Sequence, residues 1–456
     1  MEATPAADLR KPLISPINEA EADSESGVLK YDLPKPTFTE ELGCVLNMAL
    51  SILGPGVLSI PYAISKSGLV VGSLMFVAAL VMNDYMIVRL IDILHLMPED
   101  QEKNFENLTE LAIGRRCRIF LQGNLVVLLL GFVCGNFVAI GDLSHTVVKY
   151  LGYTVFTKTE LLLLIIGVII VPLAMVRDLS LLGKWTSPLG MLTMFLLLIS
   201  VIYKLLSDSD VVAHPYTYMV PFDASFLLTF PIATFAFTVS PYVFPIFFDQ
   251  MMRVRLPCGT TLTRPLDEEA KARFRMVTHY AMLLSFIIYM SVGFGGFVTF
   301  GKDTEGNLLL SYAADGLTTA VSGIMCLTVV ICIPLNMYPL RLLLEGMIAP
   351  EADFSWKRFI ALSLLIIGIS LGISLAVPDM AKIFDVTGAT GCLFVSYLLP
   401  CWIVGRLEGK WGLLQLTVAI LGFITSTISL YQIVPSLWEK DDSPSPPPPS
   451  SKMAFY

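Results

Sequence analysis

Residues 47–61 read NMALSILGPGVLSIP, and this stretch decides the fold. It begins as an apolar segment, is interrupted by Gly54-Pro55-Gly56, and then continues as an apolar segment. Proline cannot donate a helical hydrogen bond and glycine weakens a helix, so the pattern predicts a membrane helix that is broken in its middle. Hydrocarbon offers no partner for exposed backbone groups, so such a break is tolerated only where it lines a cavity or a ligand site.

The composition of the 456-residue chain is that of a membrane protein. Hydrophobic residues make up 55% of the sequence and charged residues 15%, whereas a soluble domain has about a quarter charged residues. Much of the net charge of −8 lies near the two ends of the chain, and no basic stripe indicates a nucleic-acid partner. No Cys or His pair has the spacing of a metal site, and no catalytic motif is present. We therefore expect no enzyme, no metal and no bound cofactor other than a coupling ion.

Apolar segments long enough to cross about 30 Å of hydrocarbon as helices recur eleven times along the chain. They cover residues 43–64, 68–93, 119–141, 160–176, 184–206, 225–248, 276–300, 317–344, 358–377, 383–405 and 411–434. No stretch between them is long enough for a soluble domain. We therefore expect a disordered cytosolic tail over residues 1–40, a transmembrane domain over 41–435, and a disordered Pro-rich tail over 436–456.

The positions of the arginines orient these segments in the membrane. If the N-terminus is cytosolic, every arginine falls in a cytosolic loop, at the helix ends beside it, or in the N-terminal tail. This is the excess of positive charge that cytosolic loops show. We therefore predict a multi-pass protein of the plasma membrane or of an endolysosomal or vacuolar membrane. The Pro-rich tail also offers a motif for a Pro-binding partner, although a plain solvated tail fits its composition better.

A second break is predicted in the sixth segment, where residues 230–245 read FPIATFAFTVSPYVFP. Pro241 removes an amide and disturbs the preceding turn, which frees carbonyls near Phe235 to Thr238. Taken alone, the pattern also fits an ordinary proline kink. The two breaks are five segments apart, which is the pattern of a five-plus-five inverted repeat with one helix added. The predicted fold is an all-α membrane protein of eleven helices, in which helices 1 and 6 are discontinuous.

Two facing breaks suit a zwitterion such as an α-amino acid. The free amides after Gly56 favour a carboxylate, and the freed carbonyls of the sixth segment accept hydrogen bonds from an ammonium group. Gly54 and Gly56 let the backbone approach closely because they have no Cβ. The predicted substrate contacts are Ser51, Gly54, Pro55, Gly56, Val57, Phe235, Phe237, Thr238, Asn136 and Asn336.

Three groups of residues carry a resemblance to a known family. They are the stretch from Asn47 to Ala63; Phe235-Ala236-Phe237 with Pro241 and Pro245-Ile246; and Thr299-Phe300-Gly301 followed by Asn307-Leu308-Leu309, with Pro334 and Pro339-Leu340-Arg341. On these residues the chain resembles the amino acid/auxin permease family from about Thr39 to Val434, especially its branch of neutral amino acid transporters related to systems A and N. The resemblance implies a LeuT-like fold of eleven helices and secondary transport of amino acids.

Departures from that branch bear on the coupling ion. Leu50 stands where sodium-coupled members carry an Asn, and Cys332 stands where they carry a Thr. Leucine cannot bind a hard cation, and a thiol binds one poorly. The remaining candidates for ion coupling are Asn47, Ser51, Thr328 and Asp84. Na⁺ and H⁺ both stay possible coupling ions, and the two departures favour a proton or exchange without an ion.

Some polar residues within the segments have a structural interpretation beside the functional one. Asp84 either pairs with Arg89 or binds a proton, and the pairing is favoured. Asn136 and Asn336 either contact the substrate or join two helices by hydrogen bonds. Asp385 is expected at the membrane interface.

These patterns together predict a secondary active transporter of neutral amino acids that works by alternating access. Helices one, two, six and seven are expected to rock against helices three, four, eight and nine. The alternative is a membrane sensor that binds an amino acid and signals through its tails with little net transport. The tails are short, which counts against the sensor, and binding without flux would identify it.

Overall fold

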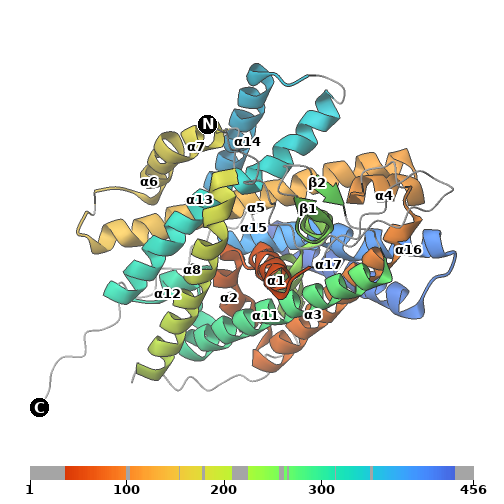
Figure 1. Cartoon of the computed structure of the whole chain (residues 1–456). Helices are drawn as coiled ribbons and strands as arrows, with labels where there is room; N and C mark the ends of the chain where they lie inside the picture. Colours follow the sequence, from red (N-terminus) through yellow and green to blue (C-terminus); the bar gives the residue numbers. More distant parts are fainter. Residues whose placement is uncertain are drawn as a thin grey trace, which may run out of the picture.

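The computed structural model describes residues 36–98, 103–153, 155–176, 180–207, 224–255, 261–263, 267–313, 315–349 and 353–436. The helices in these ranges form a single bundle-like body (Figure 1). Most of both predicted tails lies outside the described residues. The first helix begins at Phe38, slightly before the expected start of the membrane domain at residue 41.

The described helices follow the predicted segments, with shorter helices in some of the loops. In chain order they are α1 (Phe38–Ile52), α2 (Ile60–Ser67), α3 (Leu69–Asp92), α4 (Phe105–Ala112), α5 (Arg115–Tyr150), α6 (Lys158–Ile165), α7 (Val171–Ala174), α8 (Ser180–Ser207), α9 (Thr229–Phe237), α10 (Ser240–Ile246), α11 (Glu268–Phe300), α12 (Leu308–Ser311), α13 (Gly316–Ile348), α14 (Trp356–Ala376), α15 (Met380–Thr387), α16 (Leu399–Glu408) and α17 (Leu413–Ser436). Two short strands, β1 (Arg253–Arg255) and β2 (Thr261–Thr263), pair antiparallel.

The number of membrane crossings is the one part of the predicted fold that the structure does not establish. Within the described residues, nine single spans are long and apolar enough to cross, and the bent pair Phe38–Ile52 with Pro55–Ser67 makes a tenth. The predicted fourth segment is helical from Lys158 to Ala174, with a π turn over Ile166–Ile170, and is shorter than those spans. All eleven predicted segments are helical, whereas eleven complete crossings are not confirmed.

The first break lies where the sequence places it. Pro55 has no amide, and the residue before a proline is driven toward extended backbone, so Gly54 adopts φ −99° and ψ −169°. α1 therefore ends at Ile52, and the chain continues through a 3-10 turn over Pro55–Ser59 into α2. The second half of the span is bent by 52° from the first.

The second break separates α9 from α10 at Thr238 and Val239. Thr238 leaves the helical region with φ −72° and ψ 101°. Pro241 lacks the amide that would otherwise bond to the carbonyl of Phe237, which explains why the ladder opens just before it. The prediction that helices 1 and 6 are both discontinuous is therefore confirmed.

The broken helices lie between two groups of helices. On one side α1 and α2 pack on α11, and α3 packs on α9 and α11; on the other side α5 packs on α13 and α14. Figure 1 shows α1 near the centre of the molecule, with α3, α5, α8 and α11 around it. The grouping is compatible with a bundle that moves against a scaffold.

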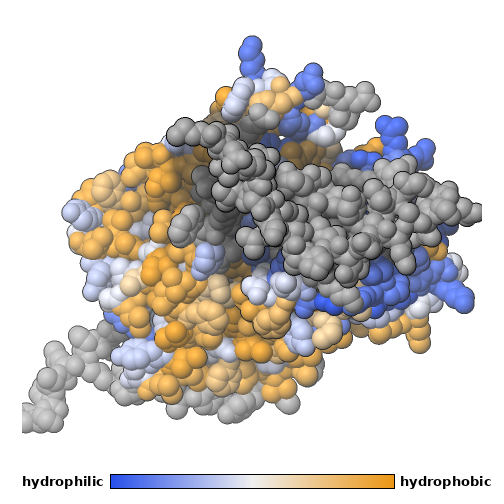
Figure 2. Space-filling view, viewed as in Figure 1, coloured by the Kyte–Doolittle hydropathy of each residue, from blue (hydrophilic) through white to orange (hydrophobic). Residues whose placement is uncertain are grey.

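Large apolar side chains cover the outside of the helices. Leu74, Val81, Ile199, Leu283 and Phe423 are all exposed, and Figure 2 shows a broad hydrophobic surface. Water would penalise such a surface, whereas lipid chains solvate it well. The exterior is therefore that of an integral membrane protein.

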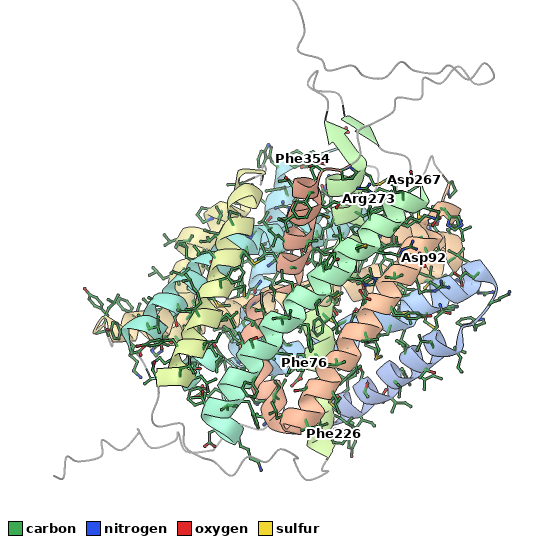
Figure 3. All side chains as sticks on the ribbon, turned by 60° about the horizontal axis from the view of Figure 1, so that its bottom comes forward. Phe76, Asp92, Phe226, Asp267, Arg273 and Phe354 are labelled. Atoms are coloured by element: carbon green, nitrogen blue, oxygen red, sulfur yellow. The ribbon has the colours of Figure 1, made fainter. Side chains whose placement is uncertain are left out.

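Ion pairs tie the helices together at the end where α1 begins. Arg273 of α11 contacts Glu41 of α1 at 2.8 Å, and Arg275 contacts Asp92 of α3 at 2.5 Å. In Figure 3, Asp92 and Arg273 lie toward one end of the molecule, and Phe226 lies toward the other. Arg273 and Arg275 therefore lie at the end that the charge pattern assigns to the cytosol.

Small residues allow α15 to sit between α5 and α9. A Cβ on Gly135 of α5 would lie 2.1 Å from the ring of Phe384, and a Cβ on Gly388, just after α15, would lie 2.1 Å from the carbonyl oxygen of Pro231 in α9. Only glycine permits these approaches. They fix the ring of Phe384 between the two groups of helices.

Candidate functional site

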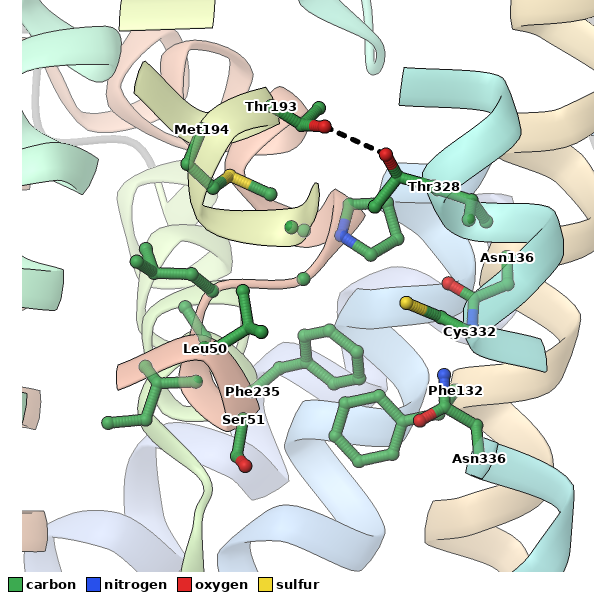
Figure 4. Close-up of a pocket in the computed structure, with 18 of the residues that line it drawn as sticks. Leu50, Ser51, Phe132, Asn136, Thr193, Met194, Phe235, Thr328, Cys332 and Asn336 are labelled. Carbon is green, nitrogen blue, oxygen red and sulfur yellow. Dashed lines mark hydrogen bonds between the residues drawn. The ribbon is translucent and has the colours of Figure 1, made fainter. Parts of the chain in front are cut away.

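A cavity of about 140 Å³ lies at the two breaks (Figure 4). A cavity of about 150 Å³ is known to hold a molecule of the size of benzene, so this volume suits a small organic ligand. Eight of the described helices contribute to its wall: α1, α5, α8, α9, α10, α11, α13 and α15. The lining residues are Leu50, Ser51, Ile52, Leu53, Gly54, Pro55, Gly56, Phe132, Asn136, Gly190, Thr193, Met194, Phe235, Ala236, Thr238, Tyr242, Tyr289, Met325, Thr328, Val329, Cys332, Asn336 and Phe384.

The lining is apolar and aromatic with a few uncharged polar groups. Phe235 stacks on Phe384 with ring centroids 4.2 Å apart and contacts Phe132 at 4.7 Å. Asn136 and Asn336 bring amides from the two scaffold helices α5 and α13 (Figure 4). No carboxylate, lysine or arginine lines the cavity within the part of the chain that the structure describes. The site therefore suits a ligand whose own charges cancel.

The last carbonyl of α1, at Ile52, has no amide one helical turn further on to bond to, because the helix ends there. Ala49 accepts from the amide of Leu53 at 2.8 Å, and the carbonyl of Ile52 accepts from the amide of Gly54 at 3.0 Å. The hydroxyl of Tyr289 in α11 also donates to the Ile52 carbonyl, at 2.6 Å. Part of the opened ladder is thus satisfied by local turns and part by a neighbouring helix.

The end of α9 is completed in the same way. The Thr238 hydroxyl donates to the carbonyl of Thr234 at 2.6 Å, and its amide donates to the carbonyl of Phe235 at 3.2 Å. The Tyr289 hydroxyl lies 3.2 Å from the carbonyl oxygen of Ala236. Backbone acceptors of both breaks therefore face the same small volume.

The glycines on the opposite side of the first break leave space at the cavity. A Cβ on Gly54 would meet no atom within 4 Å, while a Cβ on Gly56 would lie 3.4 Å from the Phe235 ring and 3.8 Å from the Phe384 ring. Gly54 thus faces open space and Gly56 faces the aromatic wall. At both glycines the main chain itself therefore lines the cavity, because no Cβ stands in the way.

Most of the predicted site residues come together at this cavity. Those that line it are Ser51, Gly54, Pro55, Gly56, Asn136, Phe235, Thr238, Thr328 and Asn336. Val57 and Phe237 are fully buried and do not line it. Phe237 is two residues from Phe235, so a helix turns it by about 200° to the far side, where it packs on Phe76 and Tyr289.

Asp84 lies outside the cavity, and its predicted pairing with Arg89 is wrong. Its carboxylate bonds to Nδ1 of His279 in α11 at 2.8 Å. Arg89 instead contacts Glu408 at 2.6 Å. Arg89 lies five positions after Asp84, so a helix turns their side chains to different faces. A role of Asp84 in ion coupling would have to act through α11.

The other candidates for ion coupling lie on α1 before the break and on α13. Asn47 does not line the cavity, but its carbonyl accepts from the hydroxyl of Ser51 at 2.9 Å. Thr328 bonds to the hydroxyl of Thr193 in α8 at 2.7 Å, as the dashed line in Figure 4 shows. Leu50 and Cys332 both line the cavity. The residues that depart from the sodium-coupled pattern therefore lie at the site.

Three of the lining residues come from helices that the sequence analysis did not assign to the site. Thr193, Tyr289 and Phe384 come from α8, α11 and α15. Only glycine spacing hinted at any of them, because Gly131 and Gly135 of α5 mark a close approach by another helix. Asp385, expected at the membrane interface, is instead only 4% exposed. The packing of α15 between α5 and α9 carries Asp385 inside, and its Oδ1 has no hydrogen-bond partner among the described residues.

Polar contacts close the end of the cavity opposite to α1. The Ser59 hydroxyl donates to the carbonyl of Gly306 at 2.7 Å. Lys158 pairs with Asp142 of α5 at 2.5 Å, and Asn307 reaches the other oxygen of Asp142 at 3.4 Å. The loop after α11, the start of α6 and the two groups of helices are thus joined on this side.

Breaking the Lys158–Asp142 pair is expected to destabilise the protein. Asp142 is only 7% exposed, so Lys158→Met leaves a buried carboxylate with one weak amide partner. The cost is about 3 kcal/mol, the lower end for breaking a buried pair, because Lys158 itself is 32% exposed. The second change Asp142→Asn removes the charge and should recover much of the loss. Thermal unfolding of the purified single and double variants in detergent measures both. A single variant as stable as the wild type would contradict the structural role of the pair.

Comparison with known proteins agrees with this geometry. The family described as transmembrane amino acid transporter protein matches residues 42–435. The chain is 22% identical over 477 residues to sodium-coupled neutral amino acid symporter 2 of Danio rerio, covering 91% of this chain and 88% of that protein.

Solved structures share the fold at low sequence identity. The inward-facing conformation of Mhp1 matches with a TM-score of 0.54 at 13% identity, over 92% of this chain and 95% of that chain. The manganese transporter of Eremococcus coleocola, in complex with an aromatic bis-isothiourea substituted compound, matches with a TM-score of 0.51 at 12% identity, over 89% and 88%. The overall fold of this chain therefore also occurs in other proteins.

Proposed function

Because this chain belongs to the transmembrane amino acid transporter family, we propose that it carries neutral amino acids across a membrane by alternating access, with the substrate held between the two broken helices. The observation that carries the proposal is the cavity at both breaks, which offers backbone groups and uncharged side chains but no described charged side chain. A zwitterion matches it, since its two charges meet the amides and carbonyls of opposite helix ends.

Substrate groups are assigned to the two sides of the cavity by polarity. The carboxylate is assigned to the main chain at Gly54 to Gly56, where the second half of the broken span begins. The predicted contact with Val57 is not kept, because its amide donates to the Gly54 carbonyl at 3.2 Å and the residue does not line the cavity. The ammonium group lies at the carbonyls that end α9, near Phe235 to Thr238. The side chain of the substrate then points toward Asn136 and Asn336, between α5 and α13. The aromatic wall of Phe132, Phe235 and Phe384 limits its size.

The exposure of the residues around the cavity supports an inward-facing state. Ser51, at the α1 side of the break, is exposed, whereas Val57, Leu58 and Ser59 beyond the break are fully buried. The cavity thus opens toward the end where α1 begins. With the N-terminus in the cytosol, as the arginine pattern indicates, this is the cytosolic side. An N-terminal tag accessible on intact cells would overturn this orientation.

Uptake by the purified protein tests the proposal. Proteoliposomes are offered each of the twenty labelled amino acids at two pH values, with and without sodium, and empty liposomes serve as the control. Accumulation of one or more neutral amino acids is the expected result. Saturable binding without uptake would favour the sensor, for which no described residue provides a specific argument. The identity of the membrane follows from microscopy, and binding to Pro-recognising domains tests the Pro-rich tail as a partner motif.

Replacing sodium by choline is expected to change the initial uptake rate by less than about twofold. The reason is that Leu50 and Cys332 line the cavity where a cation would need oxygen ligands, and that Thr328 is already bonded to Thr193. The second measurement is uptake driven by a pH gradient. A proton does not need the set of oxygen ligands that a sodium ion needs. The Danio rerio relative is named as sodium-coupled, so this result would set the chain apart from that relative. Uptake that falls to background in choline would show instead a sodium site built from backbone carbonyls with Ser51 and Thr328.

A further inference from the structure

Tyr289 is the only described side chain whose hydrogen bonds reach the carbonyl ends of both broken helices. Its hydroxyl lies 2.6 Å from the Ile52 carbonyl oxygen of α1 and 3.2 Å from the Ala236 carbonyl oxygen of α9. The residue comes from the middle of α11 and is 1% exposed. Tyr289, Ile52 and Ala236 all line the cavity.

A phenol has one hydrogen and cannot donate it fully to two acceptors. The bond to Ile52 has the length of a good O–H···O hydrogen bond, whereas 3.2 Å is long for one. The hydrogen therefore belongs to Ile52. The carbonyl of Ala236 is left with a weak partner, and the break removes the helical amide that would otherwise reach it.

Two acceptors consequently lie side by side at the gap. One is the carbonyl oxygen of Ala236. The other is the oxygen of the Tyr289 hydroxyl, which donates to Ile52, contacts the Gly54 amide and still has one lone pair to offer. No carboxylate lines the cavity within the described ranges, so these neutral acceptors are the groups available to a cationic donor. A buried acceptor without a full hydrogen bond raises the free energy of the protein. A ligand that donates to this acceptor recovers that free energy on binding.

We propose that Tyr289 is a substrate-binding residue that, with the Ala236 carbonyl, accepts hydrogen bonds from the ammonium group of a primary α-amino acid. At the same time, its O–H holds the end of α1 against the end of α9. The inference rests on the proposed function and deepens it, because it names the part of the substrate that α11 recognises. A primary ammonium has three hydrogens to donate, and each N-methyl group removes one of them.

The ring of Tyr289 is packed independently of its hydroxyl. It contacts the ring of Phe237 edge-on, with centroids 5.5 Å apart. Tyr289→Phe therefore keeps the packing and removes only the oxygen. Because the variant also loses the hydrogen bond to Ile52, recognition of the ammonium group is separated from helix placement by comparing two substrates.

The test compares one transported amino acid with its N-methyl analogue in proteoliposomes. In the wild type the KM of the N-methyl form is expected to be about tenfold higher, since one hydrogen bond from a charged donor is lost. In Tyr289→Phe the KM of the primary amino acid is expected to rise about tenfold, and that of the analogue much less. The ratio of the KM of the N-methyl analogue to the KM of the primary amino acid therefore falls toward one in the variant. Equal weakening of both substrates would mean that Tyr289 only positions helices, and would overturn the proposal.

Tyr397→Phe is the matched control. That hydroxyl is also buried and accepts from the side-chain amide of Asn83 at 2.7 Å, but Tyr397 does not line the cavity. Its variant should keep the wild-type preference between the two substrates. The wild-type protein by itself is also a test of the proposal. If it transports both substrates with equal KM, the proposal is overturned, even if Tyr289→Phe fails to fold. Failure of the proposed function is a different result, in which the wild type accumulates no amino acid at all.

Discussion

Gly56→Leu is expected to lower amino acid uptake by about a hundredfold or more, since a displacement of about 1 Å at a reacting or binding centre can have that effect. A Cβ at Gly56 would already lie 3.4 Å from the Phe235 ring and 3.8 Å from the Phe384 ring. The remaining carbons of leucine would have to enter the cavity or push these rings apart. They would also cover the backbone that is assigned to the carboxylate.

Initial rates of uptake in proteoliposomes measure the effect, after both proteins have been shown to reconstitute equally. Gly43→Leu is the matched control, because Gly43 lies in the same span, on α1, and a Cβ there would meet no atom within 4 Å. The control is expected to transport like the wild type. Wild-type uptake by Gly56→Leu would remove the first break from the substrate site.

Gly388→Ala is expected to destabilise the protein by about 3 kcal/mol or more, at the upper end of what overpacking costs. The added Cβ would lie 2.1 Å from the carbonyl oxygen and 2.7 Å from the carbonyl carbon of Pro231. These are backbone atoms of α9, so they cannot rotate away as the end of a side chain would. α15 and α9 would have to separate, which would also move Phe384 away from Phe235.

Thermal unfolding in detergent and the yield of monodisperse protein report this loss. Gly368→Ala is the control, because Gly368 lies within α14 and a Cβ there would meet no atom within 4 Å. Alanine favours a helix more than glycine does, so the control should be neutral or slightly stabilising. Equal melting of the two variants would show that α15 does not need its close contact with α9.

Local chemistry encodes the two breaks. Pro55 removes an amide and forces Gly54 into extended backbone, and Pro241 removes the amide opposite the Phe237 carbonyl. Both effects act within one helical turn, so the sequence alone predicts where the ladders open. The all-helical membrane fold follows equally directly from the length of the apolar segments and from the five-segment spacing of the breaks.

Residues that face the ligand from other helices depend on how those helices are rotated. Apolar side chains surround nearly every membrane helix, so hydropathy does not mark the inward face as it does in a soluble protein. Tyr289 is more than two hundred positions from Ile52, and only the packing of α11 on α1 joins them. The same applies to Thr193 beside Thr328, and to Asp84, which bonds to His279 of another helix and not to the arginine nearer in the sequence.

The sequence by itself determined that two membrane helices break, and at which residues, because proline and glycine act on their own turn of backbone. Only the tertiary structure decided what meets at the breaks: a tyrosine from α11, a phenylalanine from α15 and a threonine pair between α8 and α13. The physical reason is that helix rotation is set by close contacts between helices, such as those at Gly135 and Gly388, whose partners lie far away along the chain.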